Sequence, residues 1–314
     1  MVVTMKKKFA LMLAVSMAVG TVLVGCGSAA KDAAQTAAGA EEQADTDTAQ
    51  EAADAAESTD DVTAEGTEET GTDSDTASVD TDLIYAVEAG SAGEAAAQDN
   101  GLQTNVVTSQ ADALMEVAAG TSDAAIIDLL MAGAMIGEGT SYPNLTHTTE
   151  LTTEEYGVGC RKGSDLASYI NAVFGESYAD GTMKETAAVY GVQEALVEQP
   201  ASEFVASAED SDVAYIQEKG NLIIGITEFE PMDYKDESGE WVGFDADMAR
   251  LTAEKLGVEA QFVVIDWDNK IMELESKTID VVWNGMTLTA ETTSAMECTN
   301  AYCNNAQVIV VPAE

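Results

Sequence analysis

The chain has 314 residues, of which 57 are acidic and 13 are Lys or Arg, so its formal net charge is −44 at pH 7. Recognition of phosphate requires a basic surface, and this excess of carboxylates excludes a nucleic-acid-binding protein. Four cysteines in a chain of this length exclude a small fold built on disulfides. The charge is unevenly distributed, because residues 1–26 contain three lysines and no acid, whereas residues 27–80 contain 16 acids and one lysine.

The N-terminal residues have the pattern of a secretory signal. Lysines 6–8 precede an uncharged apolar run, residues 9–25, that is short for a membrane span and ends in small residues. The motif Leu23-Val24-Gly25-Cys26 resembles the lipobox of bacterial lipoproteins, which implies that residues 1–25 are removed and that Cys26 is diacylated. An uncleaved membrane anchor is the alternative. Both place the rest of the chain outside the cytoplasmic membrane.

Residues 26–81 are predicted to be an acidic, disordered tether. Ala, Glu, Asp, Thr, Ser, Gln and Gly dominate this stretch, and it contains no aromatic residue and no proline. Such a segment cannot bury enough apolar area to offset the entropy lost on ordering. Its like charges repel one another and extend the chain.

From residue 82 onward, short β-branched runs alternate with helical patterns. Ser109 reads as the N-cap of a helix that Gly120 ends. This alternation is typical of a mostly parallel sheet covered by helices. The strands predicted in this half are 83–87, 105–108 and 124–127.

The later part of the chain repeats this alternation. Leu114-Met115-Glu116-Val117 followed by Asp123 aligns with Ile271-Met272-Glu273-Leu274 followed by Asp280. Two α/β lobes of similar architecture are therefore expected, with a ligand site beyond the carboxyl ends of their strands and a hinge between them. The strands predicted here are 222–226, 261–265 and 281–283, and the helices are one that ends at Gly257 and one over 268–276.

Two long stretches resemble the extracellular solute-binding proteins, family 3 type, that supply polar amino acids to ABC transporters. Residues 219–311 resemble the first lobe of these proteins, and residues 83–190 resemble their second half. The motifs that carry the resemblance are Phe229-Glu230-Pro231-Met232-Asp233-Tyr234, Gly239-Glu240-Trp241-Val242-Gly243-Phe244-Asp245, Val87-Glu88-Ala89-Gly90-Ser91 and Glu155-Tyr156-Gly157-Val158-Gly159-Cys160-Arg161-Lys162-Gly163. The resemblance implies a two-lobed α/β fold of the periplasmic-binding-protein-like type II class.

The order of the two stretches is the reverse of the family's order. This predicts a circularly permuted chain, in which a segment such as 198–220 joins the old ends. Lobe two is then expected at 82–157 plus a final strand in 305–314, and lobe one, with the hinge strands, at 158–304. A fusion of two half-proteins is the alternative.

The resemblance also implies a set of ligand-binding residues. Asp128 stands where the family holds the ligand's ammonium group, and Phe229 where an aromatic ring stacks on the ligand. The alternatives are a helix N-cap for Asp128 and a core position for Phe229. The remaining expected positions are Asn284, Gly285 and Thr287 on lobe one, and Gly90 and Ser91 at a helix N-terminus suited to an anion.

One position departs from the family. Thr292 stands where the family has an arginine that clamps the ligand's carboxylate, so no cationic clamp is expected in this site. Glu88, Glu228 and Glu230 are expected near the cleft mouth, which favours a basic amino acid or an amine. The alternative is that these three acids are solvated rim residues.

The remaining reactive side chains predict no cofactor and no metal. Cys160, Cys298 and Cys303 are expected to be free buried thiols, with a disulfide between Cys160 and Cys303 as the alternative. His147 has no partner cluster, so no metal site is expected. A glycine-rich phosphate loop with a lysine is absent from the sequence.

The expected function is that of a monomeric, lipid-anchored binding protein at the outer face of the cytoplasmic membrane. It captures a free polar or basic amino acid by closure of its lobes, delivers it to an ABC transporter permease and catalyses nothing. One alternative is a transport-dead or ligand-sensing lipoprotein. Another is an enzyme similar to the cyclohexadienyl and arogenate dehydratases.

Overall fold

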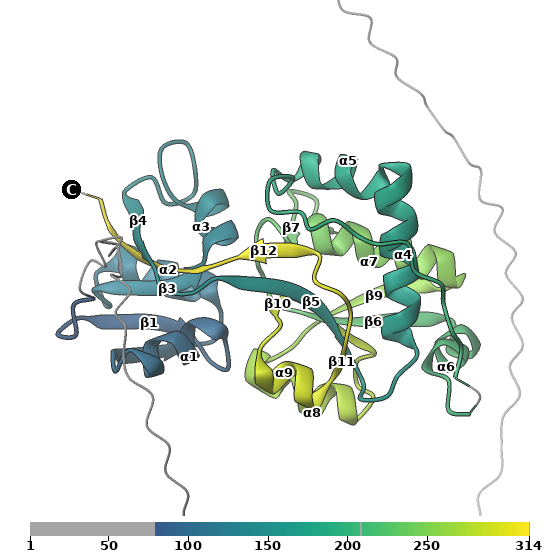
Figure 1. The fold of residues 1–314 in the computed structure, drawn as a ribbon. Helices are drawn as coiled ribbons and strands as arrows, with labels where there is room; N and C mark the ends of the chain where they lie inside the picture. The colour runs from purple at the N-terminus through teal and green to yellow at the C-terminus, as the bar shows by residue number, and fades with distance from the viewer. Residues whose placement is uncertain (1–78, 208, 314) are drawn as a thin grey trace, which may run out of the picture. The chain divides into compact units, whose positions relative to one another are not determined.

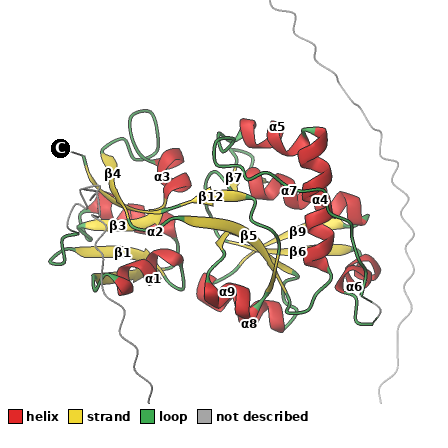
Figure 2. Cartoon of the chain, in the orientation of Figure 1, coloured by secondary structure: helices red, strands yellow, loops and turns green. Residues whose placement is uncertain are grey.

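Two β-sheets organise the part of the chain that the computed structural model describes, residues 79–207 and 209–313 (Figure 1). The first sheet has the strand order β2-β1-β3-β13-β4. Helices flank both sheets (Figure 2), which establishes the predicted α/β class. The strands of the first sheet are β1 (Ile84–Glu88), β2 (Gln103–Val107), β3 (Ala124–Asp128), β4 (Leu145–Glu150) and β13 (Gln307–Pro312).

The second sheet has the strand order β11-β5-β10-β6-β9, and β12 pairs with β5 beside this path. Strands β7 (Tyr234–Lys235) and β8 (Trp241–Val242) form a separate two-stranded ribbon. The strands of the second sheet are β5 (Glu154–Cys160), β6 (Asn221–Ile226), β9 (Glu259–Val264), β10 (Val281–Thr287), β11 (Glu297–Cys298) and β12 (Cys303–Asn305).

The helix between β2 and β3 begins and ends where the sequence predicts. The Ser109 hydroxyl accepts a hydrogen bond from the backbone N–H of Asp112, and Gly120 ends the helix in the left-handed conformation at φ 72°. Strand β1 is parallel to both β2 and β3, as a βαβαβ unit requires. The helices of this part are α1 (Ala92–Asp99), α2 (Gln110–Ala119) and α3 (Leu129–Met135).

The helix predicted over 268–276 is divided in two. A 3₁₀ turn, η1 (Trp267–Asn269), precedes α8 (Lys270–Glu275), because the backbone N–H of Lys270 bonds to the carbonyl of Trp267, three residues back. The remaining helices of this half are α4 (Leu166–Asp180), α5 (Thr182–Val189), α6 (Asp212–Lys219), α7 (Phe244–Leu256) and α9 (Ala290–Ala295).

Strand β10 is longer than the predicted 281–283. It continues to Thr287, and its pairing with β5 is irregular between Val282 and Met286. Asn284 and Gly285 lie in this irregular stretch, and Gly285 has φ 55°, so the residues do not show the apolar alternation of a regular strand. This bulge turns the end of the strand toward the site described below.

The last described strand returns to the first sheet from the second. Strand β13 pairs antiparallel with β3, with Gln307 opposite Asp128 and Val308 opposite Ile127. The preceding strand, β12, pairs with β5 in the second sheet. The chain therefore passes between the sheets once before β5 and once between β12 and β13, and Figure 1 shows these two segments side by side.

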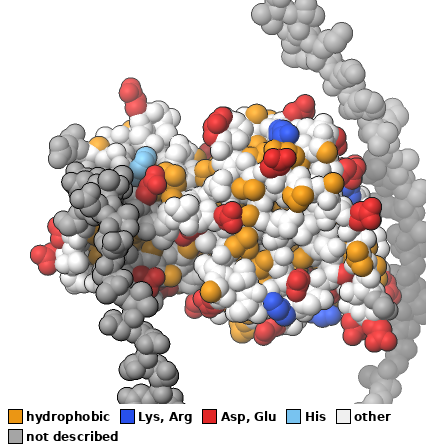
Figure 3. Space-filling model, in the orientation of Figure 1, with side chains coloured by type: hydrophobic (Ala, Val, Ile, Leu, Met, Phe, Trp, Pro, Cys, Tyr) orange, Lys and Arg blue, Asp and Glu red, His pale blue; other side chains and the backbone are white. Residues whose placement is uncertain are grey.

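A single buried apolar cluster contains residues of both sheets, among them Ile127 and Val308 of the first and Trp283 of the second. Within the described residues, no helix is both long enough and apolar enough to cross a membrane. On the face drawn in Figure 3, acidic side chains are scattered and basic ones are few. The negative charge does not mark a single patch on that face.

Candidate functional site

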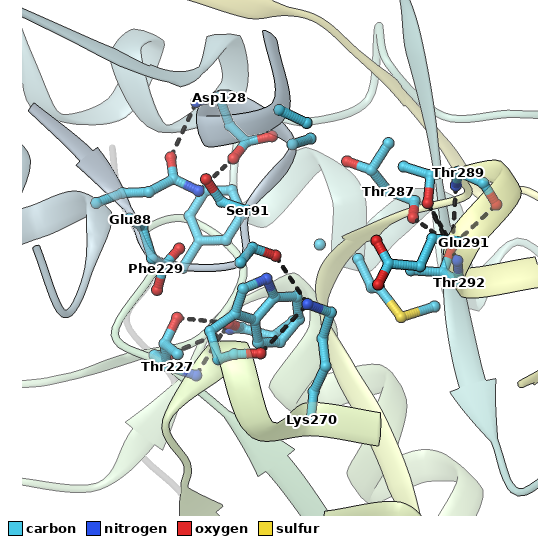
Figure 4. Close-up of a pocket in the computed structure, with 18 of the residues that line it drawn as sticks. Glu88, Ser91, Asp128, Thr227, Phe229, Lys270, Thr287, Thr289, Glu291 and Thr292 are labelled. Carbon is cyan, nitrogen blue, oxygen red and sulfur yellow. Dashed lines mark hydrogen bonds between the residues drawn. The ribbon is translucent and has the colours of Figure 1, made fainter. Parts of the chain in front are cut away.

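A cavity of about 230 Å³ is lined by residues of both sheets. The first sheet contributes the turn after β1 and the end of β3, and the second contributes β10, α9 and the η1–α8 region. Figure 4 labels Ser91, Asp128, Phe229, Thr287 and Thr292 around this cavity. All eight predicted binding positions line it. They are Gly90, Ser91, Asp128, Phe229, Asn284, Gly285, Thr287 and Thr292.

Gly90 and Ser91 form the turn between β1 and α1. Gly90 has φ 67°, a conformation that glycine adopts without strain. The Ser91 hydroxyl accepts a hydrogen bond from the backbone N–H of Glu94 at 3.1 Å. The Glu94 carboxylate in turn accepts one from the N–H of Gly90 at 2.7 Å. The N–H groups of Gly90 and Glu94, at the helix N-terminus expected to bind an anion, are therefore already hydrogen-bonded within the protein.

Asp128 is buried and its carboxylate accepts hydrogen bonds from four side chains. It is the N-cap residue of α3, yet its side chain makes no capping hydrogen bond. Burial, and then the nearby Glu154 carboxylate, raise the pKa of Asp128 to about 7, against the hydrogen bonds that it accepts. The donors are Tyr156 Oη at 2.5 Å, Gln307 Nε2 at 3.0 Å, Gln110 Nε2 and Asn305 Nδ2.

Phe229 belongs both to the buried core and to the cavity wall. Its ring packs edge-on against Tyr156, with the ring centroids 6.3 Å apart. A Cβ atom at Gly285 would lie 2.5 Å from Cε1 of Phe229, so only glycine fits there beside the ring. Gly285 and Phe229 thus shape the apolar side of the cavity together.

The Asn284 amide is used within the protein. Its Oδ1 accepts hydrogen bonds from the backbone N–H of Thr227 at 2.9 Å and from the Thr227 hydroxyl at 2.7 Å. Its Nδ2 donates to the Thr227 carbonyl at 3.1 Å and to Asp233 Oδ2 at 2.9 Å. This side chain therefore holds the β6 end against β10 and supports the cavity wall from behind.

The two predicted hydroxyl positions are also engaged. Thr287 Oγ1 donates to Glu154 Oε2 at 3.0 Å. Thr292 and Thr289 form a capping box at the start of α9, in which Thr292 Oγ1 accepts from the Thr289 N–H at 2.9 Å. The Thr292 hydroxyl lies 3.0 Å from the Thr287 carbonyl, to which it donates its single proton. Thr292 stabilises a helix end here, in addition to lining the cavity.

The expectation that the site has no cation is wrong. Lys270, at the start of α8, lines the cavity and is only 8% exposed. Its Nζ donates to the carbonyl of Gly90 at 2.8 Å and to that of Trp267 at 3.2 Å. Burial lowers its pKa. Lys270 follows the carboxyl end of β9. Because ligands bind beyond the carboxyl ends of strands in such sheets, its position in the sequence could have identified it as a candidate.

The three expected acids separate. Glu88 is 2% exposed and lines the cavity, whereas Glu228 is exposed and Glu230 half-buried, and neither lines it. Burial, and then the charge of Asp128, raise the pKa of Glu88 to about 8. Glu228 is therefore a solvated residue outside the cavity, whereas Glu88 is part of the cavity wall.

The three described cysteines, Cys160, Cys298 and Cys303, are free thiols, and Cys298 is half-buried rather than buried. No disulfide joins Cys160 to Cys303. Across the described ranges, no group of three His, Cys, Asp or Glu side chains is placed to bind a metal ion, and His147 is exposed. Cys26, the predicted lipidation site, lies outside the described residues.

Residues 222–314 match the family model of the bacterial extracellular solute-binding proteins, family 3. The L-cystine-binding protein TcyJ of Escherichia coli (strain K12) is 33% identical over 85 residues, 27% of this chain and 32% of the relative. The arginine-binding extracellular protein ArtP of Bacillus subtilis (strain 168) is 34% identical over 93 residues, 29% and 36% of the two chains.

The cyclohexadienyl dehydratase of Pseudomonas aeruginosa (strain PAO1) is 32% identical over 85 residues, 27% of this chain and 32% of the enzyme. The chain thus spans about a third of the length of each of these curated relatives. These three relatives are two binding proteins and one enzyme.

Proposed function

We propose that this chain, whose residues 222–314 match the family model of the bacterial extracellular solute-binding proteins of family 3, captures a free polar or basic amino acid between its two sheets. The observation that carries the proposal is the cavity itself. It is lined from both sheets, and the eight positions chosen from the sequence converge on it from segments up to two hundred residues apart. The relatives named for binding cystine and arginine support this ligand class.

Capture follows from movement of one sheet against the other. The β1–α1 turn of the first sheet meets η1 and α8 of the second, since a Cβ atom at Gly90 would lie 2.7 Å from Cα of Asp268. The Lys270–Gly90 hydrogen bond joins the same two segments. The described conformation is closed, and the two crossing segments beside β5 and β12 serve as the hinge on opening.

Delivery requires a position beside the membrane. Diacylation of Cys26 would hold the domain at the outer face of the cytoplasmic membrane, with the acidic segment 26–81 as its tether. An ABC transporter permease is the proposed acceptor of the amino acid. The lobe order, with the matched segment 222–314 following the part that resembles the second lobe, is proposed to result from circular permutation.

The likeness to a cyclohexadienyl dehydratase makes an enzyme the second candidate. The cavity has what such an enzyme needs for acid–base chemistry, because Glu88 and Asp128 have pKa values of about 8 and about 7. Lys270 supplies a cation for a carboxylate substrate. An enzyme would convert the bound molecule into a product, whereas a binding protein would release it unchanged.

The test is a thermal-unfolding screen of the full chain against the common amino acids, ornithine, polyamines and a cyclohexadienyl carboxylic acid. A ligand at one hundred times its Kd stabilises the folded state by about 2.7 kcal/mol, a shift of several degrees for a domain of this size. Stabilisation by one chemical group of amino acids, recovered unchanged afterwards, supports the binding protein. Aromatisation of the cyclohexadienyl acid, seen by ultraviolet absorbance, supports the enzyme. A cooperative melt that no compound shifts supports a transport-dead protein.

A further inference from the structure

Two side chains that can carry opposite charges lie on the cavity wall, and neither forms an ion pair within the described residues. Glu88 ends β1 of the first sheet, and Lys270 begins α8 of the second. Figure 4 shows Glu88 on the side of Asp128 and Ser91, and Lys270 approaching from the other side. Both side chains are more than nine-tenths buried. Burial of a charge is costly unless a partner compensates it, so an opposite charge on a ligand would stabilise the ionised form of each group.

The Glu88 carboxyl has free hydrogen-bonding capacity. Its Oε1 is buried and has no hydrogen-bond partner among the described residues. An oxygen that is both buried and unpartnered is a rare and unfavourable arrangement in a folded protein. A donor on a molecule in the cavity would satisfy it.

The Lys270 ammonium has one proton to spare. It has three N–H donors, and two are used on the carbonyls of Gly90 and Trp267. The Trp267 ring lies beneath it, with Nζ 5.1 Å from the ring centroid. These contacts fix the ammonium in position while leaving its positive charge without a carboxylate partner in the described part of the chain.

The positions expected to hold the ligand's two charged groups are largely engaged within the protein. Asp128 receives three side-chain donors on Oδ1 and one on Oδ2. Thr292 donates its proton to the Thr287 carbonyl. Most of the hydrogen-bonding capacity of both groups is therefore used before a ligand binds.

We infer that Glu88 accepts the ammonium group of a bound amino acid and that Lys270 pairs with its carboxylate. This assignment rests on the proposed function. The ligand then bridges the two sheets, because its two charges meet groups that belong to different sheets. The Lys270–Gly90 bond places the ammonium correctly only when the sheets are closed, so the carboxylate is held only in that state.

The test uses isothermal titration of the full chain with L-histidine, L-arginine and L-lysine. Each is paired with its decarboxylated amine and with its deaminated acid. The variants are Glu88→Gln and Lys270→Met, and Lys270→Arg keeps the charge. Glu228→Gln and Lys184→Met are the controls, because both side chains are exposed and neither lines the cavity.

The expected result is a loss of selectivity that depends on the removed group. Lys270→Met should weaken binding of the amino acid by at least tenfold and leave the affinity for the decarboxylated amine within twofold. Glu88→Gln should also weaken binding of the amino acid by at least tenfold, and it should leave the affinity for the deaminated acid within twofold. Lys270→Arg should retain more affinity than Lys270→Met.

Three outcomes overturn the assignment. If wild-type protein binds but the two variants lose no more affinity than the controls, the proposed function stands and the assignment fails. Equal losses for the amino acid and both analogues would show that these residues only maintain the fold. If the wild-type protein binds none of these probes and no amino acid shifts its thermal unfolding, the proposed function fails and the assignment fails with it.

Discussion

Lys270 of α8 donates a 2.8 Å hydrogen bond to the backbone carbonyl of Gly90, in the β1–α1 turn of the other sheet. The same turn is in van der Waals contact with Asp268, two residues before the lysine. A glycine and a lysine 180 residues apart thereby hold the two sides of the cavity together. Because a backbone carbonyl accepts this bond, the contact depends on the path of the turn and on the lack of a side chain at Gly90.

Gly90→Ala is expected to prevent closure. The new Cβ atom would lie 2.7 Å from Cα of Asp268, a distance that requires the sheets to separate. Small-angle X-ray scattering should show a larger radius of gyration than for the wild type. Gly101→Ala is the matched control, since Gly101 has φ 66° and its Cβ atom would meet nothing within 4 Å. It carries the same backbone strain, and an equal change in both variants would contradict the prediction.

Gly285→Ala is expected to destabilise the cavity wall. Its Cβ atom would lie 2.5 Å from the Phe229 ring, and overpacking of this kind costs about 1–3 kcal/mol. The positive φ adds about 1–2 kcal/mol. Urea unfolding should show a larger loss in free energy of unfolding for this variant than for Gly239→Ala, where φ is also positive but a Cβ atom would meet nothing within 4 Å. Adding Phe229→Leu should restore part of the loss; no recovery would argue against a clash with the ring.

Stability without ligand is expected to fall as the pH rises from about 4.5 to about 8. Glu88 has a folded-state pKa of about 8 against 4.5 when exposed, so the folded state binds more protons in this interval. Stability then decreases with pH, because the slope follows the difference in bound protons between the unfolded and folded states. Asp128, with a pKa of about 7, acts in the same direction.

Glu88→Gln should make this pH dependence shallower. Melting temperatures measured from pH 5 to pH 8.5 should fall less steeply for the variant than for the wild type. Glu228→Gln, at an exposed position, should leave the slope unchanged. A wild-type protein whose melting temperature rises across this interval would show that Glu88 is ionised in the folded state.

Asp280→Ala is expected to cost about 3 kcal/mol, because it removes the carboxylate partner of half-buried Lys219 and the acceptor of the Ile223 N–H, whereas Arg161 keeps its pair with Asp212. Asp280 is fully buried, accepts a hydrogen bond from the backbone N–H of Ile223 at 2.8 Å and pairs with Lys219 and Arg161. Its counterpart in the other half is Asp123, which is exposed and accepts one from the N–H of Ile84 at 2.9 Å.

Asp123→Ala serves as the comparison for Asp280→Ala. Loss of an exposed hydrogen bond typically costs about 1 kcal/mol. The loss in free energy of unfolding, measured with urea, should therefore be about three times larger or more for Asp280→Ala than for Asp123→Ala. Similar losses would indicate that the hydrogen bond to the strand, rather than the ion pairs, carries the stabilisation by Asp280.

The pair Asp123 and Asp280 also shows how far local sequence patterns could be trusted. Each of these aspartates exchanges two hydrogen bonds with one strand residue, Ile84 for Asp123 and Ile223 for Asp280. The aspartate N–H donates to the carbonyl of that residue, and the aspartate carboxylate accepts from its N–H. The repeated sequence spacing therefore reflects a repeated local structure. The same is true of the Ser109 cap and the Gly120 helix end.

The division of the 268–276 helix and the extension of β10 could not be predicted in this way. The β10 extension contains a polar amide and a glycine, whose place in the strand depends on partners in the loop after β6 and in α7. Asn284 bonds to Thr227 and Asp233, and the Gly285 N–H donates to Asp245 Oδ2 at 2.7 Å. Periodicity within the strand contains no information about these contacts.

The sequence, through its family resemblance, predicted eight of the residues that line the cavity but not Lys270. The strand ends and helix starts that carry these residues depend on interactions within a few positions of the chain. Only the tertiary structure decided which of those side chains remain free. The donors to Asp128 come from positions 18 to 179 residues away along the chain. Lys270 is buried, and its ammonium bonds to the turn at Gly90 in the other sheet. The availability of a polar group depends on every neighbour that can bond to it, and those neighbours become known only when the two sheets are placed together.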